Sequence, residues 1–192
     1  LAYLAPAILS GHRVLVSTGT KNLQEQIYFK DIPLLREALG VPFTAACMKG
    51  RGNYLCLHRF AAMRDDIEAG SPADRVYLEM VDDWAACTTT GDRAELADLP
   101  EDVPFWTGIA ATSENCVGSE CPEFDKCFVT RMRQRAAASD MVIVNHHLLC
   151  ADAAVLKSTS LAVVRACACA VSDEARERVY RAVQFFGVAV TT

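Results

Sequence analysis

Short apolar segments alternate with amphipathic helical patterns at both ends of the chain. The segments 13–17, 43–47, 141–145 and 167–172 consist mostly of small or branched apolar residues. Runs of this length and composition are typical of strands that are buried on both faces. Because helical patterns lie between the first two of these segments, the order predicts a parallel sheet covered by helices.

The expected helices of this region have recognisable ends. One covers residues 1–10 and stops at Gly11, and a second covers 21–29. We expect Asp31 to cap a further short helix that ends at Gly40.

A different pattern occupies the middle of the chain. Residues 57–69, 73–87 and 123–138 have helical periodicity, whereas 88–122 are rich in Thr, Gly, Asp, Glu and Pro and show little periodicity. So long a stretch without regular structure is uncommon in a compact domain, unless something such as a bound metal cluster organises it. The sequence therefore predicts a sheet domain interrupted by an inserted lobe.

Four of the nine cysteines bracket this lobe. Cys116, Cys121 and Cys127 form a C-x4-C-x5-C cluster among turn-forming residues, and Cys56 lies 60 residues upstream of Cys116 in GRGNYLC. Four thiolates at such spacings can hold an iron–sulfur cluster or a zinc ion. The other five cysteines lie in strand or helix patterns and are expected in the core; they are Cys47, Cys87, Cys150, Cys167 and Cys169.

Composition and charge narrow the class of protein. The chain has 192 residues and a formal net charge of −5, which neither favours nor excludes a nucleic-acid partner. No secretory signal is visible in these 192 residues, and no apolar run among them is long enough to span a membrane. Metal-binding thiols in a reducing cytoplasm are therefore expected. Since the sequence lacks an initiator Met and opens within a helical pattern, we expect it to be a piece of a longer protein.

An acidic pair, Asp173–Glu174, follows the last apolar segment. Acids at the carboxyl end of a buried parallel strand are where nucleotide-hydrolysing enzymes hold Mg²⁺ and activate water. Acids that begin a helix and interact with its dipole would give the same pattern. The pair alone does not separate these readings.

Taken together, these segments resemble the DinG-type and YoaA-type bacterial helicases, relatives of the XPD group of helicase superfamily two. The resemblance covers nearly the whole chain and rests on motifs in the family's order. They are LVSTGTKNLQEQIYFKDIPLL, KGRGNYLC, TGDRAELADLPED, the C-x4-C-x5-C cluster, SDMVIVNHHLL and QFFGVAVTT.

The resemblance implies an α/β fold: a RecA-like parallel sheet of the P-loop NTPase type, with an inserted, mostly helical iron–sulfur lobe. Residues 1–55 would be the first part of a motor domain, 56–128 the lobe, and 129–192 the return to the motor domain. Cys56, Cys116, Cys121 and Cys127 would hold a 4Fe-4S cluster.

For the nucleotide site, the resemblance makes Asp173 a Mg²⁺ ligand and Glu174 the base that activates water for ATP hydrolysis. Arg176 occupies the position of the family's DEAH histidine, and an always-charged side chain cannot replace a neutral acceptor. The family's phosphate-binding GKT loop and second motor domain are not among these 192 residues.

The resemblance also implies contacts with single-stranded or forked DNA. The candidate residues are Thr18, Thr20, Lys21, Gln26, Arg51, Arg131 and Arg135, and Lys49 could act in the same way. The residues by themselves favour simpler roles: Thr20 as a helix N-cap, and Arg131 and Arg135 on a solvated helix face. His146 and His147 follow a strand, where local hydrogen bonding is the expected role.

The sequence thus predicts part of an ATP-dependent DNA helicase that translocates on single strands and carries a structural cluster. Two alternatives remain open. One is a non-enzymatic module that binds zinc or a cluster, and the other is a degenerate ATPase that only binds DNA, which the Arg176 substitution suggests.

Overall fold

The computed structural model describes residues 2–67, 72–100, 103–149 and 169–172. The chain divides into two compact units, and each is described separately. The first comprises Leu1–Lys49 and Arg133–Thr192, and the second comprises Gly50–Met132.

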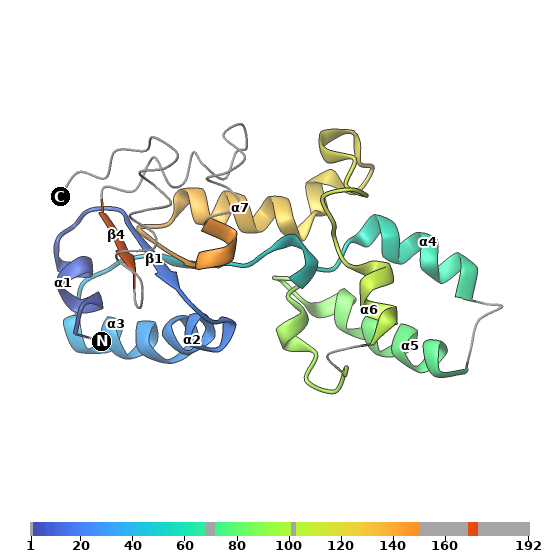
Figure 1. Cartoon of the computed structure of the whole chain (residues 1–192), viewed down its shortest axis with the longest axis horizontal. Helices are drawn as coiled ribbons and strands as arrows, with labels where there is room; N and C mark the ends of the chain where they lie inside the picture. Colours follow the sequence, from blue (N-terminus) through green and yellow to red (C-terminus); the bar gives the residue numbers. More distant parts are fainter. Residues whose placement is uncertain (1, 68–71, 101–102, 150–168, 173–192) are drawn as a thin grey trace. The chain divides into compact units, whose positions relative to one another are not determined.

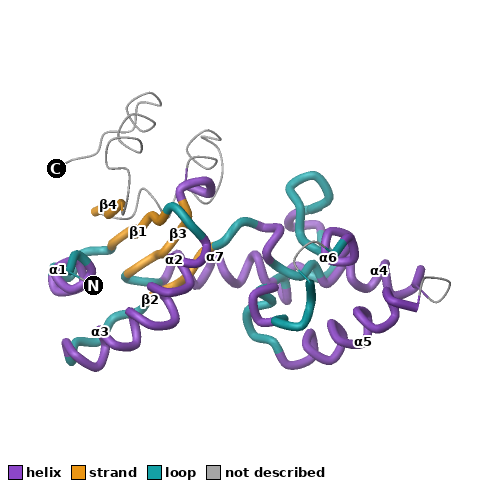
Figure 2. The backbone as a smooth tube through the Cα atoms, turned by 60° about the horizontal axis from the view of Figure 1, so that its bottom comes forward, coloured by secondary structure: helices purple, strands orange, loops and turns teal. Residues whose placement is uncertain are grey.

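A four-stranded parallel sheet forms the centre of the first unit, in the order β2-β3-β1-β4. Its strands are β1 (Val14–Thr18), β2 (Ala45–Met48), β3 (Met141–Asn145) and β4 (Cys169–Ser172). Figure 2 shows them side by side, with segments far apart in the sequence brought together. The predicted α/β class and the parallel strands are confirmed. Each strand begins within two residues of its predicted first residue and ends within one residue of its predicted last residue.

One face of this sheet carries the core of the unit. Val14 and Val16 of β1 are in register with Met141 and Ile143 of β3, so all four side chains share a face. They pack in one buried cluster with residues of helix α1 (Leu4–Leu9) and of the helix that follows β1, namely Leu4, Ile27, Ile32 and Leu35. Burial of branched side chains on a sheet face is the main stabilising term of such a unit.

A single helical segment follows β1, where two helices were predicted (Figure 1). It consists of α2 (Lys21–Gln26), a π-helical turn (Ile27–Asp31) and α3 (Ile32–Leu39). Asp31 is helical and makes no capping hydrogen bond, so the predicted cap is wrong. Pro33 lacks an N–H and crowds the preceding turn, and a local widening into a π turn accommodates it. Gly40, with φ +62°, ends the segment as predicted.

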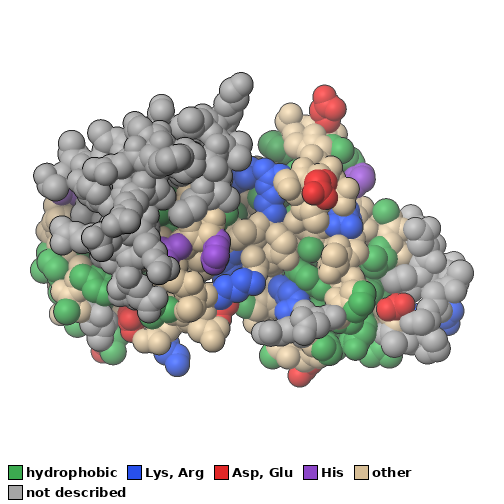
Figure 3. Space-filling view, viewed as in Figure 1, with side chains coloured by type: hydrophobic (Ala, Val, Ile, Leu, Met, Phe, Trp, Pro, Cys, Tyr) green, Lys and Arg blue, Asp and Glu red, His purple; other side chains and the backbone are tan. Residues whose placement is uncertain are grey.

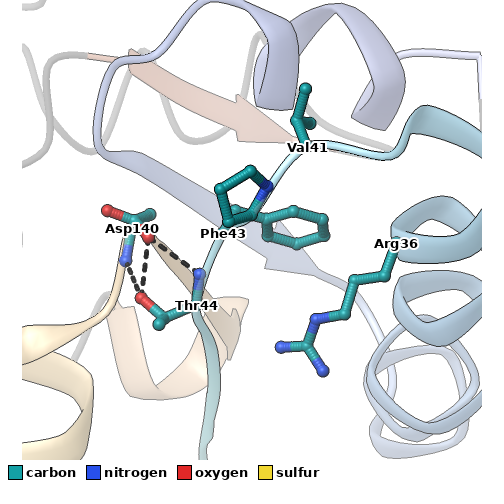
Figure 4. Close-up of a pocket in the computed structure, with 6 residues that line it drawn as sticks. Arg36, Val41, Phe43, Thr44 and Asp140 are labelled. Carbon is teal, nitrogen blue, oxygen red and sulfur yellow. Dashed lines mark hydrogen bonds between the residues drawn. The ribbon is translucent and has the colours of Figure 1, made fainter.

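A clasp at the amino end of the sheet joins the segments that precede β2 and β3. The Asp140 carboxylate accepts hydrogen bonds from the backbone N–H and the hydroxyl of Thr44, both at 2.8 Å (Figure 4). These bonds hold the pKa of Asp140 below its usual value. The clasp borders a surface hollow next to Arg36, Val41 and Phe43. Because this hollow lies at the amino ends of the strands, it is separate from the carboxyl edge, where the sequence places its functional residues.

The second unit is mostly helical. It contains α4 (Leu57–Ile67), α5 (Pro72–Cys87), α6 (Pro104–Ile109) and the start of α7 (Phe128–Ala138), linked partly by short 3₁₀ turns. Its stretch 88–111 buries more apolar surface than we expected, since Leu96, Leu99, Phe105, Trp106 and Ile109 are all under 10% exposed. The expectation that 88–122 lack regular structure is therefore wrong for this part, which contains α6 and the 3₁₀ turn Arg93–Glu95. The apolar residues are too irregularly spaced to show as a periodic pattern.

Among the described helices, none combines the length and the apolar character that crossing a membrane requires.

Gln24 fastens α2 to two strands. Its side-chain amide, fully buried, donates to the carbonyls of Met48 and Ile143, both at 2.9 Å. We expect Gln24→Ala to lower the free energy of unfolding by about 2–3 kcal/mol, because two buried carbonyls lose their donor. Urea denaturation measures this.

Gln26 on the same helix provides the control for that measurement, since its side chain is exposed. Gln26→Ala should change stability by less than about 0.5 kcal/mol. If Gln24→Ala and Gln26→Ala lowered the free energy of unfolding equally, the buried hydrogen bonds of Gln24 would contribute nothing to stability.

Candidate functional site

Cys56 is anchored at the start of α4 by backbone hydrogen bonds. Its N–H donates to the carbonyl of Ile109, at 2.9 Å, and its own carbonyl accepts from Phe60 one helical turn later. The preceding residue, Leu55, is fully buried and forms an isolated antiparallel bridge with Ala110. These contacts fix the backbone of Cys56 through residues more than 50 positions away.

The Cys56 thiol lies close to two other predicted ligands. Burial raises the pKa of this thiol, and the neighbouring thiols of Cys121 and Cys127 raise it further. The backbone N–H groups of Arg59 and His58, in the first turn of α4, hydrogen bond to its sulfur and act in the opposite direction. The fold therefore places Cys121 and Cys127 within electrostatic range of Cys56, although Cys127 is 71 residues away in the sequence.

Two short 3₁₀ turns present the other members of this group. Cys121 follows the turn Gly118–Glu120 and Cys127 follows the turn Phe124–Lys126, each as the C-terminal cap. Cys116 lies in the run 113–120, in which every residue is exposed. No residue from 112 to 127 is buried, in contrast to the stretch 88–111.

All four predicted ligands are free thiols, so the donor chemistry fits an iron–sulfur cluster. Their geometry is less complete. Among the described residues, no three or more His, Cys, Asp or Glu side chains are arranged closely enough to hold a metal ion. Cluster binding would therefore require the four thiols to come closer together than they lie in this structure.

Gly91, which the sequence analysis did not single out, supports the elements that carry two of these cysteines. Its φ is +64°, and a Cβ there would lie 2.2 Å from the ring of Phe128, the residue after Cys127. Its carbonyl accepts from the N–H of Leu55, the residue before Cys56. The sequence signal is the position of Gly91 in the TTTGD turn, although only the fold shows what the turn approaches.

Two of the cysteines expected in the core can be assessed. Cys87 is exposed at the end of α5, so that expectation is wrong for this residue, whereas Cys47 is half-buried in β2. The side chains of Cys150, Cys167 and Cys169 lie outside the described part of the molecule.

The carboxyl edge of the sheet carries the first group of DNA candidates. Thr18 is fully buried, and its hydroxyl lies within hydrogen-bonding distance of the carbonyls of Thr20 and Val144, so it shapes the turn. Thr20 caps α2, since its side-chain oxygen accepts from Leu23 at 3.2 Å. Lys21 and Gln26 are exposed and remain available to a ligand.

The other basic candidates differ in their environment. Lys49 is 3% exposed and pairs with Glu25 at 2.6 Å, so it does not reach a ligand on the surface. Arg51 is half-buried, and Arg131 and Arg135 are exposed four residues apart on α7. Figure 3 shows Lys and Arg side chains reaching the surface on the face that it draws.

Ser17 and His146 join the ends of β1 and β3. The Ser17 hydroxyl lies 2.6 Å from Nδ1 of His146, which follows β3 directly. The sequence predicts local hydrogen bonding for this histidine, and the observed contact instead crosses to another strand. The Nε2 atom of His146 is buried, and none of the residues that the structure describes forms a hydrogen bond with it.

Asp173 and Glu174 lie outside the described residues, so the structure does not describe their geometry. The strand that precedes them is described. The last residue of β4, Ser172, is in register with Ser17 of β1. The carboxyl end of β4, after which the acidic pair comes next in the sequence, therefore lies beside the end of β1 that carries Ser17.

Comparison with known proteins gives consistent results. No family model matches the chain. The chain is 38% identical over its whole length to the ATP-dependent DNA helicase YoaA of Haemophilus influenzae and 36% identical to YoaA of Escherichia coli, in each case covering 30% of that protein. It is 33% identical to the ATP-dependent helicase DinG of Mycobacterium tuberculosis, over 92% of the chain and 29% of that protein. The chain spans about a third of the length of these relatives, and with identity of this extent across its own full length it belongs to the YoaA and DinG family.

Proposed function

We propose that the chain is part of an ATP-dependent DNA helicase that translocates on single strands and separates duplex or forked DNA. The observation that carries this is the identity of 36–38% to YoaA proteins across the whole chain. The parallel sheet supports it, since motor domains of this type place ligands at the carboxyl ends of such strands.

In this proposal Cys56, Cys116, Cys121 and Cys127 hold a structural 4Fe-4S cluster. The proximity of Cys56 to Cys121 and Cys127 supports the set. The cluster would order the loop 112–127, which has no buried residue of its own to hold it. The core at 88–111 would not depend on the cluster. The lobe would comprise residues 56–128 and would interrupt the motor domain.

The proposed DNA contacts are with the phosphate backbone, so binding should depend strongly on salt and weakly on base sequence. Lys21 and Arg51 are the two basic candidates that precede the lobe in the sequence. We expect Lys21→Ala with Arg51→Ala to flatten the slope of log K against log salt by about 1.4, since each lost contact with a single strand contributes roughly 0.7. Fluorescence anisotropy with a labelled oligonucleotide measures the slope.

Lys30 and Arg64 provide a charge-matched control, because both are exposed and neither is among the candidate DNA contacts. Replacing them together by Ala should leave the slope unchanged. A double variant of Lys21 and Arg51 that keeps the original slope would exclude these residues from the interface.

The substitution at Arg176 favours a second function, a degenerate ATPase that binds DNA without unwinding it. Turnover of ATP by the intact protein, with and without single-stranded DNA, separates the two functions. A zinc-bound module is distinguished by the absorption spectrum of protein purified without oxygen, since zinc is colourless and an iron–sulfur cluster is brown.

A further inference from the structure

The hydrogen bond between Ser17 and His146 connects the end of β3 to the turn that follows β1. Ser17 is 2% exposed, so its hydrogen bond with His146 is shielded from water and the two strand ends are held together. The next residue, Thr18, contacts the carbonyl of Thr20, and Thr20 caps α2. His146 is therefore linked through three short steps to the turn that precedes Lys21.

The second ring nitrogen of His146, Nε2, lies on the other side of the imidazole. If the Ser17 hydroxyl donates to Nδ1, the ring carries its proton on Nε2, and we assign that tautomer. Nε2 is buried and has no hydrogen-bond partner in the described part of the chain. A buried polar atom in a native protein nearly always has a partner, and a bound ligand can supply it.

From this geometry we infer that His146 is a positioning residue that joins the DNA-contacting turn to the nucleotide. Its Nδ1 side holds Ser17 and the turn at Thr18–Thr20, and its Nε2–H donates to a phosphate oxygen of the bound nucleotide. The location supports this ligand, because nucleotides bind at the carboxyl edge of parallel sheets and β3 ends at residue 145 on that edge. The inference rests on the proposed function and assigns to His146 a coupling between the two ligands.

Two substitutions separate the halves of this role in the intact protein. His146→Asn keeps an amide at the position of Nδ1 and lacks an atom at Nε2. It should bind a single-stranded oligonucleotide within twofold of the wild type, while kcat for DNA-stimulated ATP hydrolysis falls about tenfold or more. His146→Ala loses both atoms, so it should also bind the oligonucleotide several-fold more weakly.

The controls make each outcome decisive. His147 is the exposed neighbour, and His147→Asn should match the wild type in both assays. His146→Gln, whose amide reaches the position of Nε2, should recover part of kcat. A His146→Asn variant with wild-type kcat would overturn the phosphate contact, and a His146→Ala variant with wild-type DNA affinity would overturn the link to the turn.

Failure of the proposed function has a different signature. In that case the wild-type protein itself would hydrolyse no ATP, with or without DNA, whatever residue stands at 146. If the wild type is stimulated by DNA and His146→Asn is stimulated equally, only the inference about His146 fails.

Discussion

The Cys121→Ser variant is expected to purify without iron and with a protease-sensitive loop at 112–127. A serine hydroxyl is a poor substitute for a thiolate ligand, and the loop has no buried residue to hold it once the cluster is lost. The stretch 88–111 should stay protected, because Trp106, Phe105 and Ile109 bury it independently of any metal. Iron and sulfide analysis, together with mass spectrometry of limited proteolysis fragments, measures both effects.

Cys87 is the matched control for this variant, since it is an exposed free thiol in the same unit. Cys87→Ser should keep its full iron and sulfide content, as should Cys47→Ala in β2. Iron retained by Cys121→Ser would remove Cys121 from the ligand set. Iron lost from Cys87→Ser or Cys47→Ala, with the circular dichroism unchanged, would show that the wrong four cysteines were chosen.

The Glu174→Gln variant of the intact protein is expected to bind nucleotide normally and to hydrolyse ATP about 10²–10⁴-fold more slowly. The amide keeps the shape of the side chain and cannot take a proton from water. The parallel pairing of β4 with β1 supports this role, because β4 ends at the carboxyl edge of the sheet and the acids come next in the sequence. Steady-state ATPase rates and the affinity for a nonhydrolysable nucleotide give the two quantities.

Glu37→Gln, an exposed carboxylate on α3, should leave the ATPase rate unchanged. Arg176→His restores the family's residue, so it should raise DNA-stimulated turnover more than basal turnover. Wild-type turnover in Glu174→Gln would exclude this motif from hydrolysis. An Arg176→His variant without effect, in a protein that already unwinds DNA, would show that the substitution is harmless.

Local patterns were sufficient to predict most of the first unit. Buried parallel strands consist of continuous apolar residues, and β1 and β3 stand out because their flanking segments are polar. Gly40 marked a helix end since its positive φ is readily adopted only by glycine. The prediction failed at Asp31, where Pro33 favours a π turn over a break, because a propensity rule does not include the strain of a neighbouring ring.

The cysteine spacing indicated a ligand set, and the tertiary structure decided which of its members lie close together. Cys56 is separated by 65 residues from Cys121, so only folding of the lobe could bring them together. The same holds for Gly91 against Phe128, since a close approach between two distant segments leaves no periodic signal in either of them.

The sequence by itself determined the family, the parallel strands and the candidate ligands, because these follow from local composition and the order of motifs. Only the tertiary structure showed that Thr18 and Lys49 are turned inward, that Gln24 joins α2 to β2 and β3, and that Ser17 meets His146 across two strands. The physical reason is that burial and hydrogen bonding depend on partners distant in sequence, and the identity of a polar residue does not specify those partners.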